Sequence, residues 1–117
     1  MSERQREVAM APEDLGRLLI ERAAAGDVGG MAELFEVDAV AGFPGRDPAQ
    51  GRAAIRARLR QALANGGGFT GTVQPALRNG DYALTSTRSE GRITAEVARR
   101  QPDGTWLFLI DVPNVMG

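Results

Sequence analysis

Two carboxylates near the C-terminus are the residues of this chain best placed to do chemistry. Asp111 directly follows Trp106–Ile110, five consecutive apolar residues. A run this apolar is buried in a small protein, so the acid beside it lies at the edge of the interior, where a carboxylate is costly without a specific role. The sequence therefore identifies Asp111 as a candidate catalytic residue.

Glu96 is the second acid of the candidate pair. A turn at Asp103–Gly104 makes segment 92–101 run antiparallel to segment 105–112, which places Glu96 opposite Asp111. A turn shifted by one residue still leaves both acids on one face. Burial and mutual repulsion each raise a carboxyl pKa, and such a pair is typical of a functional site. The structural alternative is that Asp111 bonds backbone amides while Glu96 pairs with a nearby arginine.

The rest of the composition narrows the chemistry. The chain has 117 residues and no His, Cys or Lys, so all 14 of its basic residues are Arg. Proton transfer would have to use carboxylates or Tyr82, and neither disulfides nor a zinc or iron site are expected. No cluster of acids suited to an oxygen-ligated metal appears in the sequence. We expect no metal and no cofactor.

Charge and hydropathy argue against several partners. A net charge of −1 gives no basic field for nucleic acid. Arg52, Arg56 and Arg60 recur every four residues, which could form a phosphate-binding ridge but is more typical of a solvated helix face. The longest apolar runs fall far short of the ~20 residues of a membrane span. We expect a cytoplasmic protein that binds neither nucleic acid nor membrane.

The first half of the chain reads as helices that could cover a pocket. Residues 1–11 are polar and are expected to form a disordered or frayed leader to one domain that spans 12–117. Apolar residues at helical spacing, together with cap residues, predict three helices: 12–25, a short one capped by Asp27, and 51–64. A short strand over 39–43 and a turn-rich loop over 44–48 are predicted between the last two helices.

The second half reads as sheet. Three turn signals containing glycine predict four antiparallel strands, near 69–78, 81–89, 92–101 and 105–112. This order of elements predicts an α+β protein with its helices on one face of the sheet. Strict alternation puts Leu109 on the same side as the two acids and Trp106 on the other side. Either side could lie beneath the helices, and a β-bulge would reverse part of the assignment.

The last strand is apolar on both sides, so both sides need a cover. Three helices can cover only one face of a sheet. In a chain of this size a second copy is the obvious cover for the other face. The sequence therefore predicts a homodimer that forms through the sheet.

Four motifs follow one another between residues 12 and 114. They are Ala25-Gly26-Asp27-Val28, Leu34-Phe35-Glu36-Val37-Asp38-Ala39-Val40, Gly51-Arg52-Ala53-Ala54-Ile55-Arg56 and Arg99-Arg100-Gln101-Pro102-Asp103-Gly104-Thr105-Trp106. Together they resemble the nuclear transport factor 2-like superfamily, which includes SnoaL-like polyketide cyclases and ketosteroid isomerase. The resemblance implies a strongly curved antiparallel sheet wrapped around three N-terminal helices, a cone-like α+β barrel with an apolar cavity, and a dimer through the sheet.

The resemblance also implies which residues surround the cavity. The helix-one tyrosine of ketosteroid isomerase falls near Leu18 and its general base near Gly42 or Phe43, where this chain has no such group, so that reaction is not expected. Its oxyanion-hole acid falls near Glu96. With the acids inside, the expected ligand-binding residues are Leu19, Phe35, Phe43, Leu59 and Leu109 as apolar wall, Thr85, Thr87 and Asn114 as polar contacts, and Trp106 near the cavity or the dimer face.

Two main functional hypotheses follow. The first is a homodimeric module that binds a hydrophobic small molecule without catalysis, which requires only the cavity. The second is a carboxylate-based enzyme of isomerase, cyclase or epoxide hydrolase type, acting on a polyketide- or steroid-like carbonyl compound. Asp111 would then be the base and Glu96 the protonated partner that stabilises an enolate. A regulatory role beside another domain is the third alternative.

Overall fold

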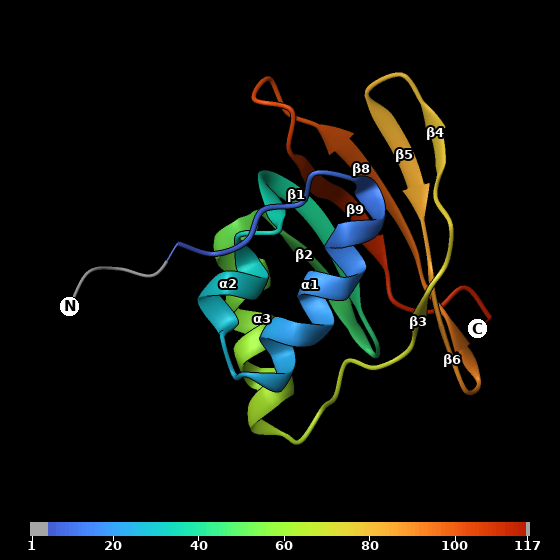
Figure 1. The fold of residues 1–117 in the computed structure, drawn as a ribbon. Coiled ribbons are helices and arrows are strands. Elements are labelled where there is room, and N and C mark those ends of the chain that lie inside the picture. Colours follow the sequence, from blue (N-terminus) through green and yellow to red (C-terminus); the bar gives the residue numbers. More distant parts are fainter. Residues whose placement is uncertain (1–4, 117) are drawn as a thin grey trace.

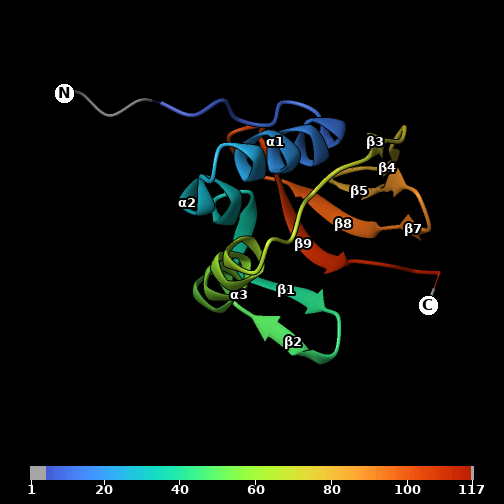
Figure 2. The same cartoon turned by 90° about the horizontal axis from the view of Figure 1, so that it is seen from below.

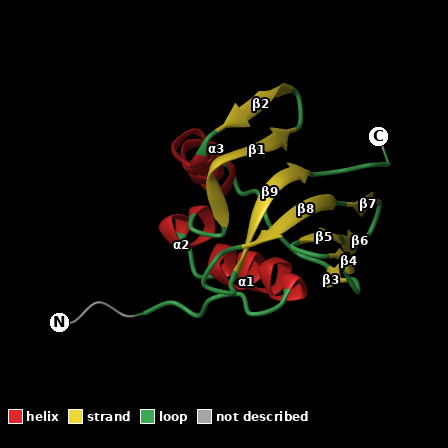
Figure 3. Ribbon diagram, turned by 90° about the horizontal axis from the view of Figure 1, so that it is seen from above, coloured by secondary structure: helices red, strands yellow, loops and turns green. Residues whose placement is uncertain are grey.

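Three helices lie on one side of a curved sheet in this protein, whose structure is a computed structural model that describes residues 5–116 (Figure 1). The elements follow the chain in this order: α1 Pro12–Ala24, α2 Val28–Ala32, β1 Phe35–Phe43, β2 Arg46–Gln50, α3 Arg52–Ala64, β3 Thr72–Val73, β4 Leu77–Asn79, β5 Tyr82–Thr85, β6 Thr87–Ser89, β7 Arg92–Ile93, β8 Ala95–Arg100 and β9 Trp106–Val112. The α+β prediction is confirmed, with the helices grouped on one side of the strands (Figure 3).

The main sheet has six strands in the order β2-β1-β9-β8-β5-β4, so the apolar C-terminal strand lies near its centre (Figure 2). Neighbouring strands of this sheet are antiparallel, except that β1 and β9 run parallel to each other. A second sheet of three short strands has the order β3-β6-β7. Strands β2 and β4 form the edges of the main sheet, which therefore stays open while it curves around the helices.

The predicted helices are confirmed within a residue or two at their ends. Pro12 begins α1, and Asp27 caps α2 by accepting a hydrogen bond from the backbone N–H of Gly30 at 3.0 Å. The strand that follows was predicted too short, because β1 begins at Phe35 rather than at Ala39. Leu34 and Phe35 continue the helical spacing of the short helix, so the pattern alone concealed where the strand starts.

The loop predicted over 44–48 is wrong, because most of it belongs to β2 and makes a hairpin with β1. Three of the four predicted long strands are each broken into two pieces, at 74–76, at Ser86 and at Thr94. At the last two breaks the Ser86 hydroxyl donates to the carbonyl oxygen of Thr94, and the Thr94 hydroxyl accepts from the N–H of Thr87, each at 2.8 Å. Side-chain hydroxyls thus take part in the pairing where the β6–β7 hairpin leaves the main sheet.

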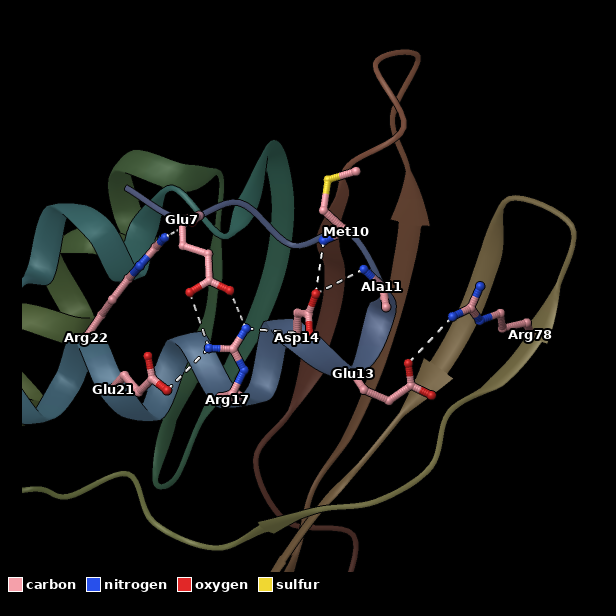
Figure 4. A network of polar contacts seen from close by, with 9 residues as sticks. All are labelled: Glu7, Met10, Ala11, Glu13, Asp14, Arg17, Glu21, Arg22 and Arg78. Carbon is pink, nitrogen blue, oxygen red and sulfur yellow. Dashed lines mark hydrogen bonds and ion pairs between the residues drawn. The ribbon is translucent and has the colours of Figure 1, made fainter. Parts of the chain in front are cut away.

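Residues 5–11 run beside α1 and reach the core through Ala9, whose carbonyl oxygen accepts a hydrogen bond from the N–H of Trp106 at 2.9 Å. Figure 4 shows Arg17 paired with Glu7 and Arg22 donating to the carbonyl oxygen of Glu7. The predicted leader spans 1–11, of which residues 1–4 lie outside the described residues. Within 5–116, no helix is long and apolar enough to cross a membrane.

The core fills the space between α1, α2, α3 and the inner face of the sheet. Its largest fully buried side chains include Leu15, Met31 and Ile55 from the helices and Phe35 and Phe108 from the strands. The two phenylalanine rings lie 5.2 Å apart between centroids. Phe35 and Phe108 pack together where β1 pairs with β9, beneath the helices. They therefore form part of the inner surface of the sheet on which the candidate site lies.

Candidate functional site

Glu96 and Asp111 are direct partners across β8 and β9, so their predicted pairing is confirmed. The route to it differs from the prediction, because Ala98 pairs with Phe108 and not with Leu109. The hairpin loop is one residue longer than a two-residue turn, and Leu109 is an extra residue between the paired positions. The two irregularities offset each other, so the acids still meet.

The bulge at Leu109 decides which side chains face the helices. Before the bulge, Trp106 and Phe108 are buried on the inner face; after it, Asp111 faces the same way while Ile110 is exposed on the outer face. The predicted placement of Trp106 opposite the acids is therefore wrong. Strict alternation fails here because a bulge adds one residue and reverses every later side chain.

The two acids lie in a mostly apolar pocket of about 80 Å³ between α1, the loop after α3 and the inner face of the sheet. Its lining consists of Gly16, Leu19, Ile20, Phe69, Thr70, Thr87, Arg92, Thr94, Glu96, Phe108, Asp111 and Pro113. A second hollow of about 250 Å³ adjoins it toward α3 and shares Asp111 and Arg92 with it. Together the two hollows form a site with apolar walls and few polar groups.

Glu96 is the better supported of the two acids. It is only 7% exposed, and the Thr85 hydroxyl donates a hydrogen bond to its carboxylate at 2.7 Å. Burial raises the pKa of Glu96, while the hydroxyls of Thr94 and Thr85 act in the opposite direction by stabilising its ionised form. Glu96 is thus a buried acid whose charge is partly accommodated by hydrogen bonds.

Asp111 accepts no such hydrogen bond from any of the described residues, and it lines both the pocket and the adjoining hollow. Burial raises the pKa of Asp111 to about 8, and the negative charge of Glu96 adds to the effect. Asp111 therefore holds a proton at neutral pH and can donate it in a hydrogen bond to a ligand. Of the two acids, Asp111 is therefore the better suited to carry a proton, and Glu96 is the one whose charge hydrogen bonds stabilise.

The predicted apolar wall is divided between the two hollows. Leu19 lines both of them, while Phe35, Phe43 and Leu59 line only the larger one. The predicted polar residue Thr87 lines the smaller pocket beside the acids. Thr85 lines neither hollow; its hydroxyl instead donates a hydrogen bond to the Glu96 carboxylate.

Three further predicted site residues line neither hollow. Leu109 occupies the bulge, and Trp106 packs at the other end of β9, with the guanidinium carbons of Arg78 and Arg100 at 5.7 and 5.9 Å from its ring centroid. Asn114 accepts a hydrogen bond from the N–H of Met116 at 3.0 Å in the C-terminal turn. Trp106, Leu109 and Asn114 are therefore not among the residues that surround the candidate site.

Several lining residues were not predicted from sequence. Phe69 is the one aromatic residue in the glycine-rich segment after α3, and that isolation was a usable signal. Phe108 was assigned to the wrong face because of the bulge. Arg92 and Thr94 line the pocket because the β6–β7 hairpin bends away from the main sheet, and no pattern in the sequence marks that bend. The described part of the chain holds no group of three His, Cys, Asp or Glu side chains that could bind a metal ion.

Comparisons with known proteins agree with this architecture. The sequence model described as a SnoaL-like domain matches residues 17–112. Among curated proteins, no sequence matches the chain at a significant level.

Solved structures share the fold at low sequence identity. The chain is similar to a putative calcium/calmodulin-dependent protein kinase type II association domain from Thiobacillus denitrificans, with 20% identity, a TM-score of 0.74 and coverage of 92% of this chain and 96% of that one. It is similar to an NTF2-like protein of cystatin-like fold from Novosphingobium aromaticivorans, with 25% identity, a TM-score of 0.61 and coverage of 85% and 75%.

A third similar structure, from Catenulispora acidiphila, was solved in complex with S-DNPA. It has 22% identity, a TM-score of 0.63 and coverage of 85% of this chain and 86% of that one. The family match spans most of the chain, and the three helices on the curved sheet agree with the fold of these similar structures. The chain therefore belongs to the SnoaL-like domain family within the nuclear transport factor 2-like superfamily.

Proposed function

We propose that this protein binds a hydrophobic small molecule in the pocket above Glu96 and Asp111. The observation that carries the proposal is a concave site with walls of Leu19, Phe69 and Phe108 and a small set of converging polar groups. This combination is the usual composition of a small-molecule site, in which apolar walls supply affinity and few polar groups fix orientation. The relative solved with S-DNPA is consistent with a ligand in this fold.

The neutral Asp111 carboxyl is the polar group best suited to orient the ligand. It faces the pocket, and as a protonated acid it can donate a hydrogen bond to a carbonyl or hydroxyl oxygen. A donor in a largely apolar pocket distinguishes ligands with an oxygen at the matching position from plain hydrocarbons, because an unpaired polar group in such a site is costly.

We further propose that the protein forms a homodimer through the outer face of the sheet. Leu84 is 51% exposed and Ile110 is 43% exposed, and Tyr82 and Val112 add further exposed apolar surface on the same face. Exposed apolar side chains gathered on one sheet favour an interface with a second copy. In such a dimer the pockets remain on the inner faces, away from the contact.

A neutral fluorescent probe tests the binding proposal directly. N-phenyl-1-naphthylamine should brighten on binding at one site per chain, and Phe69→Ala should weaken its binding about fivefold or more, since Phe69 lines both hollows. Val37→Ala is the matched control, because Val37 is 72% exposed and lines neither hollow. A probe that does not bind the wild-type chain, or equal losses in both variants, would count against the proposal.

Acid–base catalysis is the second candidate, favoured by the Glu96–Asp111 pair itself. Protonated Asp111 would hydrogen-bond a carbonyl oxygen and stabilise the enolate, while ionised Glu96 would accept a proton from the neighbouring carbon. Deuterium exchange beside the carbonyl of 2-decalone, followed by NMR, tests this step. Exchange lost in Asp111→Asn with binding retained supports an enzyme; equal exchange with and without the protein supports a binding module.

A further inference from the structure

Arg92 is the cationic side chain of the candidate site. It belongs to β7 and lines both the smaller pocket and the larger hollow beside it. Among the described residues that line these two hollows, it is the single Lys or Arg. The β6–β7 hairpin brings it there, with Ser89 as its cross-strand partner. Its guanidinium is therefore the positive charge available to anything that enters the site.

This guanidinium has no partner among residues 5–116. Several other arginines are bound: Arg99 pairs with Glu36, Arg100 with Asp81, and Arg52 donates to the carbonyl oxygen of Phe35. Arg92 makes no ion pair within 4.0 Å with any described carboxylate, although Asp111 and Glu96 line the same pocket. A half-buried cation beside two acids that do not pair with it leaves its hydrogen-bond donors open toward the cavity.

We propose that Arg92 determines the ligand class, and that the site takes a hydrophobic carboxylic acid whose carboxylate is held by Arg92 and whose apolar body lies against Leu19, Phe69 and Phe108. The inference rests on the proposed binding function and specifies its ligand. The planar fork of a guanidinium matches the two oxygens of a carboxylate. One positive charge without a second cation in the lining suits a singly charged group better than a doubly charged phosphate.

The acids of the pocket are compatible with an anionic ligand. Burial keeps Asp111 protonated at neutral pH, so it would donate a hydrogen bond to the ligand instead of repelling it. Glu96 is 7% exposed, and its charge is stabilised by the hydrogen bond from the Thr85 hydroxyl. The anionic end of the ligand would thus meet Arg92, with the apolar walls and Asp111 around the remainder.

Matched pairs of acid and alcohol test the inference at pH 7. The probes are 4-phenylbutyrate against 4-phenylbutanol and decanoate against decanol, measured by displacement of N-phenyl-1-naphthylamine. The wild-type chain should prefer each acid by about tenfold or more, because a charge-assisted contact to Arg92 is absent in the alcohol. Arg92→Gln should remove this preference while alcohol affinities stay within about twofold, and Arg92→Lys should retain part of it.

Arg88→Gln is the matched control, since Arg88 lies on β6 of the same hairpin, is exposed and lines neither hollow. Its acid preference should equal that of the wild-type chain, and unchanged thermal melting should verify that all variants fold. Alcohols that bind as well as acids would overturn the ligand class while the binding function stands. A preference that survives in Arg92→Gln, or is lost equally in Arg88→Gln, would overturn the role of Arg92. Failure of every probe to bind would overturn both proposals.

Discussion

Glu96 and Asp111 face each other across β8 and β9, yet of the two only Glu96 is stabilised by hydroxyls, those of Thr94 and of Thr85, the latter at 2.7 Å. The pair is therefore unequal although both members are carboxyls on one inner face. The hydroxyls stabilise the charge of Glu96, whereas Asp111 faces an apolar pocket without a donor from the described residues. This asymmetry separates the protonation states of the two acids and gives each a different effect on stability.

Asp111 should make the folded state less stable as the pH rises. Its pKa is raised to about 8 in the folded chain, whereas an unfolded aspartate titrates near 4. The folded state thus binds more protons between about pH 4 and pH 8, so stability falls as the pH increases through that range. Asp111→Asn cannot ionise, so it should match the wild-type chain near pH 4 and exceed it by on the order of a few kcal/mol at pH 9.

Urea unfolding at pH 4, 7 and 9 measures this difference. Asp38→Asn on β1 is the control, because Asp38 is exposed and lies outside the pocket. Its stability should follow that of the wild-type chain at every pH. A constant gap between Asp111→Asn and the wild-type chain across the series would mean that Asp111 is ionised in the folded protein at neutral pH.

Thr85 should matter most when Glu96 is ionised. Thr85→Val keeps the shape of the side chain but removes its hydroxyl, so the buried carboxylate loses one of the two hydroxyls that stabilise its charge. We expect a loss of about 1–3 kcal/mol at pH 8 and a smaller loss at low pH, where Glu96 is protonated. Thr85→Ser, which retains a hydroxyl, should recover most of the stability. Urea unfolding of the wild-type chain and both variants at the two pH values measures these losses in stability. Equal losses in the valine and serine variants would contradict a stabilising role of the Thr85 hydroxyl.

Much of the fold could be predicted from sequence because its signals are local. Pro12 and Asp27 mark helix starts through their own backbone preferences, and Gly104 lies in the turn that brings Glu96 opposite Asp111. The bulge at Leu109 could not be predicted, since nothing in its own type distinguishes it from the apolar residues around it. That one residue moved Trp106 and Phe108 to the inner face.

The walls of the pocket were harder to predict than its acids. Phe69 comes from a loop without a regular pattern, and Arg92 reaches the cavity because the strands break at Ser86 and Thr94. These positions depend on how separate elements pack, which periodicity along one strand does not encode. The sequence therefore predicted the pairing of Glu96 with Asp111 better than it predicted the shape of the pocket around them.

Arg22 should hold the N-terminal segment to the helices. It is buried, and it donates to the carbonyl oxygens of Gly30, at 2.7 Å, and of Glu7. Arg22→Met keeps much of the apolar stem but leaves both carbonyls without this donor, so we expect a loss of about 1–3 kcal/mol in urea unfolding. Arg60→Met on exposed α3 surface should stay within about 0.5 kcal/mol of the wild-type chain. Equal effects of the two substitutions would contradict the role of Arg22.

Ile110 should control self-association, because the bulge that turns Asp111 inward also leaves Ile110 outward beside Val97. A lysine there would place a charge at the centre of the apolar outer face, where a second copy could not solvate it. We expect the wild-type chain to have twice the chain mass of 12.5 kDa in light scattering and Ile110→Lys to have the single-chain mass.

Val37→Lys is the control, since Val37 is 72% exposed on another part of the surface and its substitution should leave the dimer intact. A wild-type chain that is monomeric at 50 µM would rule out the dimer, and the outer face would then need another cover.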